Sequence, residues 1–217
     1  ILFETNNIYQ DQSNYLSSSP QLQDGLLDYS LLLDGLIDEK EQGITIDLAF
    51  KYLNYKNKNI IFIDSPGHKE FTKNTAYAAT LADIAIVLVD STKGISEQTK
   101  NHLEIISIFK QIETVIFAVN KLDIVQDPQV VFDQIKNELE IMCENLSISN
   151  LNIVPISALK GDNIINKSNI VKNYDGNPLV DILSSFKIKE KDKRTLFSEL
   201  AIKKSKDFDY SILVKNI

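Results

Sequence analysis

Residues 60–68 join an apolar run to a group of side chains that could do chemistry together. The run at 60–63 is too short for a helix, and the Pro-Gly pair after it predicts a buried strand that ends in a turn. That strand would carry Asp64 to its C-terminal edge, and Gly67 would let a backbone N–H approach a ligand closely. His68 follows at once. A carboxylate, a backbone amide and an imidazole would then meet at one point, although any strand can end in such a turn.

A second group of polar residues, Asn-Lys-Leu-Asp, follows the apolar run at 115–119. The Asp123 carboxylate could accept both N–H donors on the edge of guanine, whereas adenine has an acceptor at that ring nitrogen and lacks the amino group. Lys121 could lay its apolar stem along a nucleotide, and Asn120 could tie two loops together. The alternative is a helix start after a strand, in which Asn120 or Asp123 only caps the helix.

The third group follows the apolar run at 151–156. Ser157, Ala158 and Leu159 stand there, and the backbone of Ser157 and Ala158 could offer an N–H to the guanine oxygen. Parallel strands of one sheet end at the same edge, where open α/β sheets bind their ligands. Three polar groups on successive strand ends therefore favour a guanine nucleotide as the ligand.

The phosphate end of such a nucleotide would need a metal ion and a catalytic group. The Thr45 hydroxyl could coordinate Mg²⁺, which prefers oxygen ligands, and Asp64 could bind the same ion through water. Gly67 N–H would meet the γ-phosphate, and His68 would orient the attacking water. A threonine is also common at the start of a strand, which is the plainer interpretation of Thr45. His102 lies inside a predicted helix, and we expect it to be structural.

Apolar runs and helical patterns alternate along the chain, which predicts an α/β fold with a doubly wound, mainly parallel sheet. The polar turn at 54–59 makes the first two strands antiparallel neighbours. The predicted strands are 44–53, 60–63, 84–89, 115–119 and 151–156, and the predicted helices are 26–37, 69–81, 96–109, 128–145 and 179–186.

Composition narrows the classes of function. The net charge of −7 argues against a general nucleic-acid binder and against binding to an anionic membrane surface, but a nucleotide needs only a local positive site. Cys143 is the only cysteine, so we expect a core residue, no internal disulfide and a cytoplasmic protein. No apolar run approaches 18 residues, and the first residues do not resemble a signal peptide.

The motifs together resemble those of the translation-factor class of P-loop GTPases. A narrower similarity, to the GTPase (large) subunit of bacterial sulfate adenylyltransferase, rests on residues 31–36, 39–47, 157–163 and 174–176. It covers about residues 1–186. This resemblance implies a G domain in which GTP and Mg²⁺ bind and GTP hydrolysis drives adenylylsulfate formation from ATP and sulfate. It also implies a separate, smaller catalytic subunit as partner. The alternatives are a translation elongation or release factor and a non-catalytic G-like binding module.

The chain departs from this family pattern at both ends. None of its seven glycines is followed by Lys, so the Gly-x-x-x-x-Gly-Lys-Ser/Thr loop is absent from these residues. We therefore expect a GTPase domain over 1–186 that lacks the P-loop and the first strand, leaves a gap beside 60–63, and binds Mg²⁺–GTP poorly. Residues 187–217 are interpreted as a linker and a strand at 211–214 that could begin a second domain.

Overall fold

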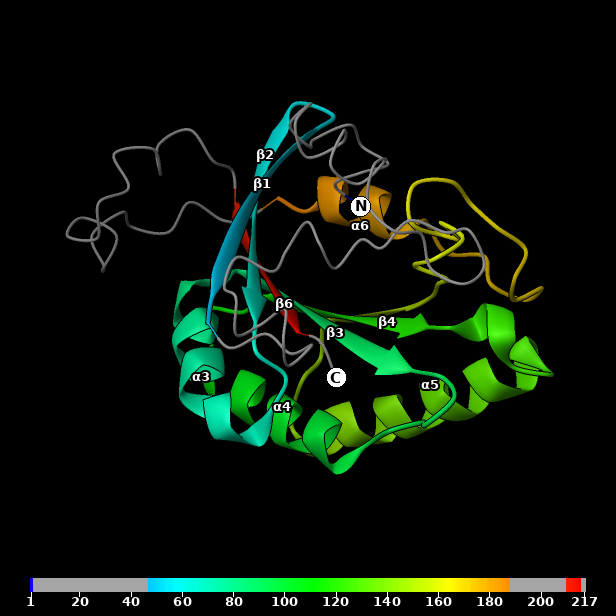
Figure 1. Cartoon of the computed structure of the whole chain (residues 1–217), viewed down its shortest axis with the longest axis horizontal. Coiled ribbons are helices and arrows are strands. Elements are labelled where there is room, and N and C mark those ends of the chain that lie inside the picture. The colour runs from blue at the N-terminus through cyan, green and yellow to red at the C-terminus, as the bar shows by residue number, and fades with distance from the viewer. Residues whose placement is uncertain (2–46, 188–209, 216–217) are drawn as a thin grey trace, which may run out of the picture.

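The computed structural model describes residues 1, 47–187 and 210–215. Thr45, the Gly-Ile pair before it and the helix predicted at 26–37 lie outside the described residues. Within the described part, six strands form one sheet in the order β1-β2-β6-β3-β4-β5 (Figure 1).

A hairpin forms one side of this sheet. Strands β1 (Ala49–Tyr55) and β2 (Lys58–Ser65) are antiparallel along their whole length, which confirms the predicted pairing. Lys56 and Asn57 connect them with φ angles of 46° and 61°, as a two-residue type I′ turn requires. The turn is shorter than the predicted 54–59 because the residues on either side of it continue the ladder.

The rest of the sheet is parallel. It contains β3 (Ile84–Asp90), β4 (Thr114–Asn120), β5 (Leu151–Pro155) and β6 (Tyr210–Lys215). Every pairing from β2 through β6, β3 and β4 to β5 is parallel. The expected doubly wound, mainly parallel sheet is therefore confirmed.

Strand β6 lies in an unexpected place, between β2 and β3. Its backbone pairs with β2 from Ile60↔Tyr210 to Ser65↔Lys215, and with β3 from Ile84↔Ile212 to Val87↔Lys215. The expected gap beside 60–63 is therefore wrong, and the strand expected to begin a second domain lies in this sheet instead. Without a strand here, β2 and β3 would each leave a row of backbone N–H and C=O groups unpaired in the middle of the sheet. The boundary at residue 186 otherwise stays a prediction.

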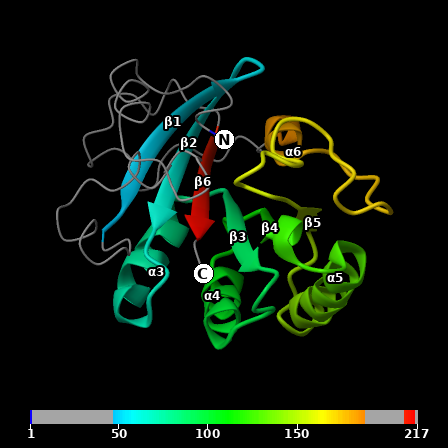
Figure 2. The same ribbon diagram turned by 45° about the vertical axis from the view of Figure 1, so that its right-hand side comes forward.

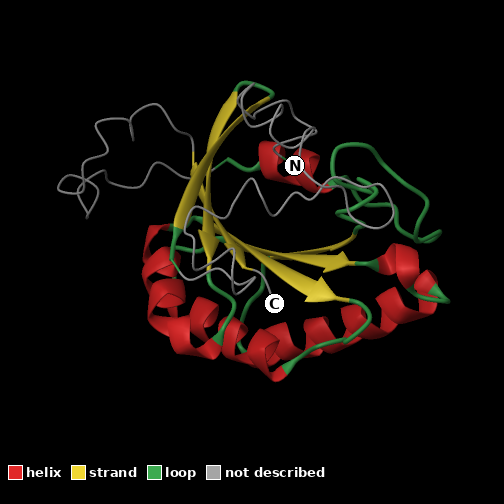
Figure 3. Cartoon of the chain, in the orientation of Figure 1, coloured by secondary structure: helices red, strands yellow, loops and turns green. Residues whose placement is uncertain are grey.

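The helices cover both faces of the sheet. Helices α3 (Thr72–Leu81), α4 (Glu97–Ile108) and α5 (Pro128–Asn145) lie along one face, and α6 (Leu179–Ser185) lies against the other (Figures 1, 2 and 3). A single 3₁₀ turn, Lys69–Phe71, precedes α3. The expected helices at 69–81, 96–109, 128–145 and 179–186 are all present, within a few residues of their predicted ends.

The hydrophobic core has two parts, one on each face of the sheet, because successive side chains of a strand point to opposite faces. Ile84 and Ile86 belong to the cluster that contains the α6 residues, whereas Ala85 and Val87 pack with residues of α4 and α5. Both sides of the strands are thus buried, which explains why their sequences are continuously apolar. Cys143 is fully buried in α5, where burial and then Glu140 raise the pKa of its thiol to about 11. It is therefore a core residue, as expected.

Across the residues that the structure describes, no helix is long and apolar enough to cross a membrane.

Candidate functional site

The ends of β4 and β5 are joined by the side chain of Asn120. Its Oδ1 accepts hydrogen bonds from the backbone N–H of Lys121 at 2.8 Å and of Ala158 at 2.9 Å. The backbone N–H of Ile156 donates to Val119 O at 2.8 Å, so β5 stays beside β4 up to this edge. The structure thus brings together the two motifs that the sequence places about 37 residues apart, as the register of β4 and β5 requires.

Lys121 has a left-handed backbone and reaches the end of the neighbouring strand. Its φ is 66°, and its Nζ lies 2.7 Å from Asp90 Oδ2 at the end of β3. Asp90 also accepts hydrogen bonds from the backbone N–H and the hydroxyl of Thr92, at 2.9 and 2.6 Å. Burial raises the pKa of Asp90, but the hydrogen bonds from Lys121 and Thr92 outweigh it and leave the pKa below its usual value. Asp90 therefore stays charged and fixes the direction of the lysine.

Asp90 was not among the predicted site residues. The signal was present, because it is an acid at the end of an apolar run whose neighbouring strand ends in Asn-Lys-Leu-Asp.

Asp123 lies in the 3₁₀ turn Leu122–Ile124 just after β4 and is recessed. Its side chain is 6% exposed, and its Oδ2 lies 3.6 Å from Nζ of Lys160. The backbone N–H of Lys160 in turn donates to Ser157 Oγ at 3.2 Å. Leu159, the last residue of that motif, is 42% exposed. A recessed carboxylate in this position can accept hydrogen bonds from the edge of a planar ligand.

Asn163 holds the loop that follows β5, although it was not among the predicted site residues. It is fully buried with a φ of 54°, a region that asparagine tolerates better than most residues. Its Nδ2 donates to Pro155 O at 2.8 Å, and its Oδ1 accepts the backbone N–H of Ser168 at 2.7 Å. The turn that carries Ser157 and Ala158 is thereby tied to the rest of the loop.

Replacing this residue, Asn163→Ala, should therefore lower the free energy of unfolding by roughly 2–4 kcal/mol, because a buried carbonyl and a half-buried N–H lose their partners. Thermal or urea unfolding of the purified chain measures the change. Asn137→Ala on the exposed face of α5 is the control and should change stability by less than about 0.5 kcal/mol. Equal stability of the two variants would show that the Asn163 bonds are unimportant.

The end of β2 carries the other predicted residues. Asp64 is 6% exposed. The contacts that hold the loop after it include Thr75 Oγ1, which donates to Pro66 O at 3.4 Å, and Gln98 Nε2, which donates to Gly67 O at 2.6 Å. His68 projects from this loop with its side chain 57% exposed, and its Nδ1 lies 3.9 Å from Glu70 Oε2. The imidazole is therefore accessible beside a fixed backbone.

The structure places the two groups of site residues on one edge of the sheet but apart from each other. Strands β6 and β3 lie between β2 and β4, which separates their ends by about 14 Å at the usual strand spacing. No single compact ligand could touch both groups. An elongated ligand lying along the carboxyl edge could.

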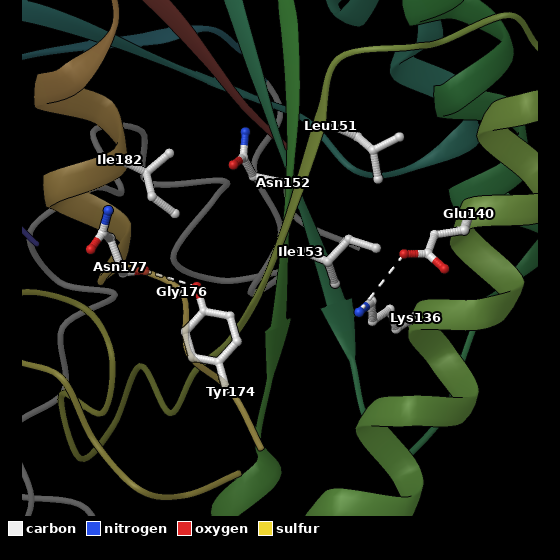
Figure 4. Close-up of a pocket in the computed structure, with 9 residues that line it drawn as sticks. All are labelled: Lys136, Glu140, Leu151, Asn152, Ile153, Tyr174, Gly176, Asn177 and Ile182. Carbon is white, nitrogen blue, oxygen red and sulfur yellow. Dashed lines mark hydrogen bonds and ion pairs between the residues drawn. The ribbon is translucent and has the colours of Figure 1, made fainter. Parts of the chain in front are cut away.

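A pocket elsewhere on the described surface is separate from this edge. It has a volume of about 360 Å³ and lies beside β5, between α5 and the segment that leads into α6 (Figure 4). Tyr174 lies in its wall, where its hydroxyl donates to Asn177 O at 2.8 Å and burial raises its pKa to about 12. None of the predicted site residues lines this pocket.

Comparison with known proteins points to one family. The model of the elongation factor Tu GTP binding domain matches residues 1–200. Sulfate adenylyltransferase subunit 1 of Aeromonas hydrophila is 39% identical over 197 residues, and that of Aeromonas salmonicida is 40% identical over 188 residues. These matches cover 89% and 85% of this chain but only 41% and 40% of the two relatives.

Among solved structures, a bacterial selenocysteine-specific elongation factor is similar, with a TM-score of 0.57 and 30% identity. The match covers 71% of this chain and 25% of that protein. The sheet order, the strand-end motifs and the match over residues 1–200 agree. The chain belongs to the elongation factor Tu GTP binding domain family.

Proposed function

We propose that this chain is the GTP-binding and GTP-hydrolysing part of the large subunit of a sulfate adenylyltransferase, which couples GTP hydrolysis to adenylylsulfate synthesis from ATP and sulfate. The relatives named sulfate adenylyltransferase subunit 1 support this choice, since they are 39% and 40% identical over most of the chain. A translation elongation or release factor is the second candidate. It has weaker support, because the identity to a selenocysteine-specific elongation factor is 30%.

The observation that carries the nucleotide assignment is the double hydrogen bond to Asn120. It sets Ala158 beside the end of β4 with its N–H on Asn120 Oδ1, and on binding this N–H would turn from Asn120 to the guanine oxygen while Asp123 accepts from the ring N–H and the amino group. Lys121, held by Asp90, would lie along the base. These roles require an acceptor at 123, and the recessed Asp123 carboxylate is one.

The phosphates would lie toward β2. The separation of about 14 Å between the ends of β4 and β2 suits a nucleoside triphosphate laid along the edge. Gly67 N–H would meet the γ-phosphate and His68 would orient water. Among the described residues no three His, Cys, Asp or Glu side chains form a metal cluster. Mg²⁺ would be held by Asp64 through water, by Thr45 and by phosphate oxygens.

The partner that this proposal requires is the small subunit that carries out adenylyl transfer, since the name of the relatives, sulfate adenylyltransferase subunit 1, implies a second subunit in them. The test uses a loop-restored protein, in which a first strand and a Gly-x-x-x-x-Gly-Lys-Ser/Thr loop of the family's form precede residue 1. Residues 210–217 are removed from it, because β6 occupies the place beside β2 where that first strand is expected. With the small subunit, ATP and sulfate, GTP should stimulate adenylylsulfate formation. Hydrolysis stimulated by ribosomes and not by the small subunit would favour the translation factor instead.

His68 is expected to act in the chemical step more than in binding. In the loop-restored protein with its partner, His68→Ala should slow GTP hydrolysis by roughly a hundredfold or more, the scale of losing a positioned catalytic group. GTP affinity should change little, because an exposed imidazole makes no strong contact with the ground-state phosphates. Single-turnover rates and equilibrium binding measure the two quantities, and equal losses in both would make His68 a binding or structural residue.

A further inference from the structure

Gln98 of helix α4 reaches the loop that carries Gly67 and His68. Its Nε2 donates to the Gly67 carbonyl oxygen at 2.6 Å, and the same atom lies 2.9 Å from Nε2 of His102, one helical turn further along. His102 is 2% exposed. A buried ring, a side-chain amide and the candidate catalytic loop are thus linked in one chain of contacts.

The chemistry of these two contacts determines which atoms carry hydrogen. A carbonyl oxygen only accepts hydrogen bonds, so the amide nitrogen of Gln98 must face Gly67. The second hydrogen of that amide points to His102 Nε2, which can accept it only when it carries no hydrogen itself. The neutral imidazole with its hydrogen on Nδ1 meets this condition, and the imidazolium ion does not.

The start of α4 fixes the position of Gln98. Ser96 caps the helix, since its Oγ accepts the Thr99 N–H at 3.1 Å and its own N–H donates to Thr99 Oγ1 at 3.2 Å. Gln98 stands inside this capped first turn, and His102 lies four residues later on the same helix face. The capped first turn of α4 therefore fixes the backbone of Gln98, and the His102 ring contacts its side-chain amide.

Holding the Gly67 carbonyl has a consequence for the next residue. A peptide unit is planar, so a hydrogen bond to the Gly67 oxygen also fixes the direction of the His68 N–H and the place of its Cα. The loop closes on itself just beyond, where the Phe71 N–H donates to His68 O at 3.0 Å. The His68 side chain is exposed, and its contacts are loose: Glu70 lies at 3.9 Å, and the Phe71 ring lies 6.4 Å away between centroids. The position of the imidazole therefore depends mainly on its backbone.

We propose that Gln98 and His102 are a positioning pair: His102, neutral and with its hydrogen on Nδ1, orients the Gln98 amide, and the amide places His68 for the chemical step. The pair would act through His68, and the proposal gives it no contact of its own with the nucleotide or the attacking water. The expected effect on GTP hydrolysis rests on the function proposed above. The tautomer of His102 and the order of the loop do not, because both can be measured in the chain without nucleotide.

The test compares Gln98→Glu with Gln111→Glu. Both substitutions have the same shape and charge change, and Gln111 also donates from a side chain to a backbone carbonyl, that of Ala79 at 3.0 Å, away from the loop. In the 217-residue chain, ¹⁵N NMR of the wild type should show hydrogen on His102 Nδ1 and not on Nε2. Exchange of the Phe71 amide hydrogen should be faster in Gln98→Glu by about tenfold, the scale of one net hydrogen bond, and unchanged in Gln111→Glu.

In the loop-restored protein, Gln98→Glu should slow hydrolysis by about tenfold or more while leaving GTP affinity nearly unchanged. Hydrogen on His102 Nε2 in the wild type, or Phe71 exchange that is the same in both variants, would overturn the proposal. So would equal hydrolysis rates in the two variants. If the loop-restored protein without substitutions hydrolysed no GTP, the proposed function would be overturned instead. The NMR and hydrogen-exchange results would then still show whether Gln98 and His102 hold the loop as proposed.

Discussion

Asp123→Asn in the loop-restored protein should weaken GTP binding by roughly a hundredfold or more and make xanthosine triphosphate the better ligand. The carboxylate is expected to accept two hydrogen bonds from guanine, and a hydrogen bond to a charged group contributes about 1.5–3 kcal/mol. An amide keeps one acceptor and adds a donor, which can meet the extra carbonyl of xanthine. The recessed position of Asp123, 6% exposed beside Lys160, makes it suited to this role.

Competition binding of the two nucleotides measures the change. Asp133→Asn, on the exposed face of α5, makes the same chemical change away from the strand ends and should leave the preference for GTP intact. If Asp123→Asn also kept that preference, the assignment of the base site to the end of β4 would be wrong.

Deleting residues 210–217 should abolish cooperative unfolding. These residues include β6, which pairs with β2 along Ile60–Ser65 and with β3 along Ile84–Val87. Each buried backbone group left without a partner costs about 1–3 kcal/mol, and several together exceed the net stability of about 5–15 kcal/mol that a domain usually has. Circular dichroism during heating, together with protease digestion, should show a loose chain with no single transition.

Deleting only residues 216–217 is the control and should leave the transition in place. The first strand of the family was expected at the same position beside 60–63, so adding that strand and its loop to the shortened chain should restore cooperative unfolding. A shortened chain that melts like the intact one would show that β6 is not needed in the centre of the sheet.

Strand ends were predictable from the sequence because their signal is local. A short apolar run predicts a strand, and the polar motif after it, Asp-Ser-Pro-Gly-His or Asn-Lys-Leu-Asp, predicts where the strand ends. In the structure β2 ends at Ser65 and β4 ends at Asn120. A tie between two loops through Asn120 was predicted for the same reason, and the structure shows that its partner is the Ala158 N–H.

Pairing between distant segments was not predictable in the same way. Residues 210–215 form a strand by their own propensity, but their place between β2 and β3 depends on which backbone groups would otherwise lack partners. The contact of Gln98 with Gly67 depends on how α4 packs against the loop after β2, and the buried turn at Asn163 depends on three segments at once. None of these leaves a periodic pattern in the sequence.

The most direct test of the account is the nucleotide preference of the loop-restored protein. Calorimetric titration with Mg²⁺–GTP and, separately, with Mg²⁺–ATP compares two ligands that share their phosphates and differ in the base. GTP should bind and ATP should not at the same concentrations, because Asp123 needs two hydrogen-bond donors that guanine has and adenine lacks. Equal affinity for the two nucleotides, or stronger binding of ATP, would contradict a guanine site at the ends of β4 and β5.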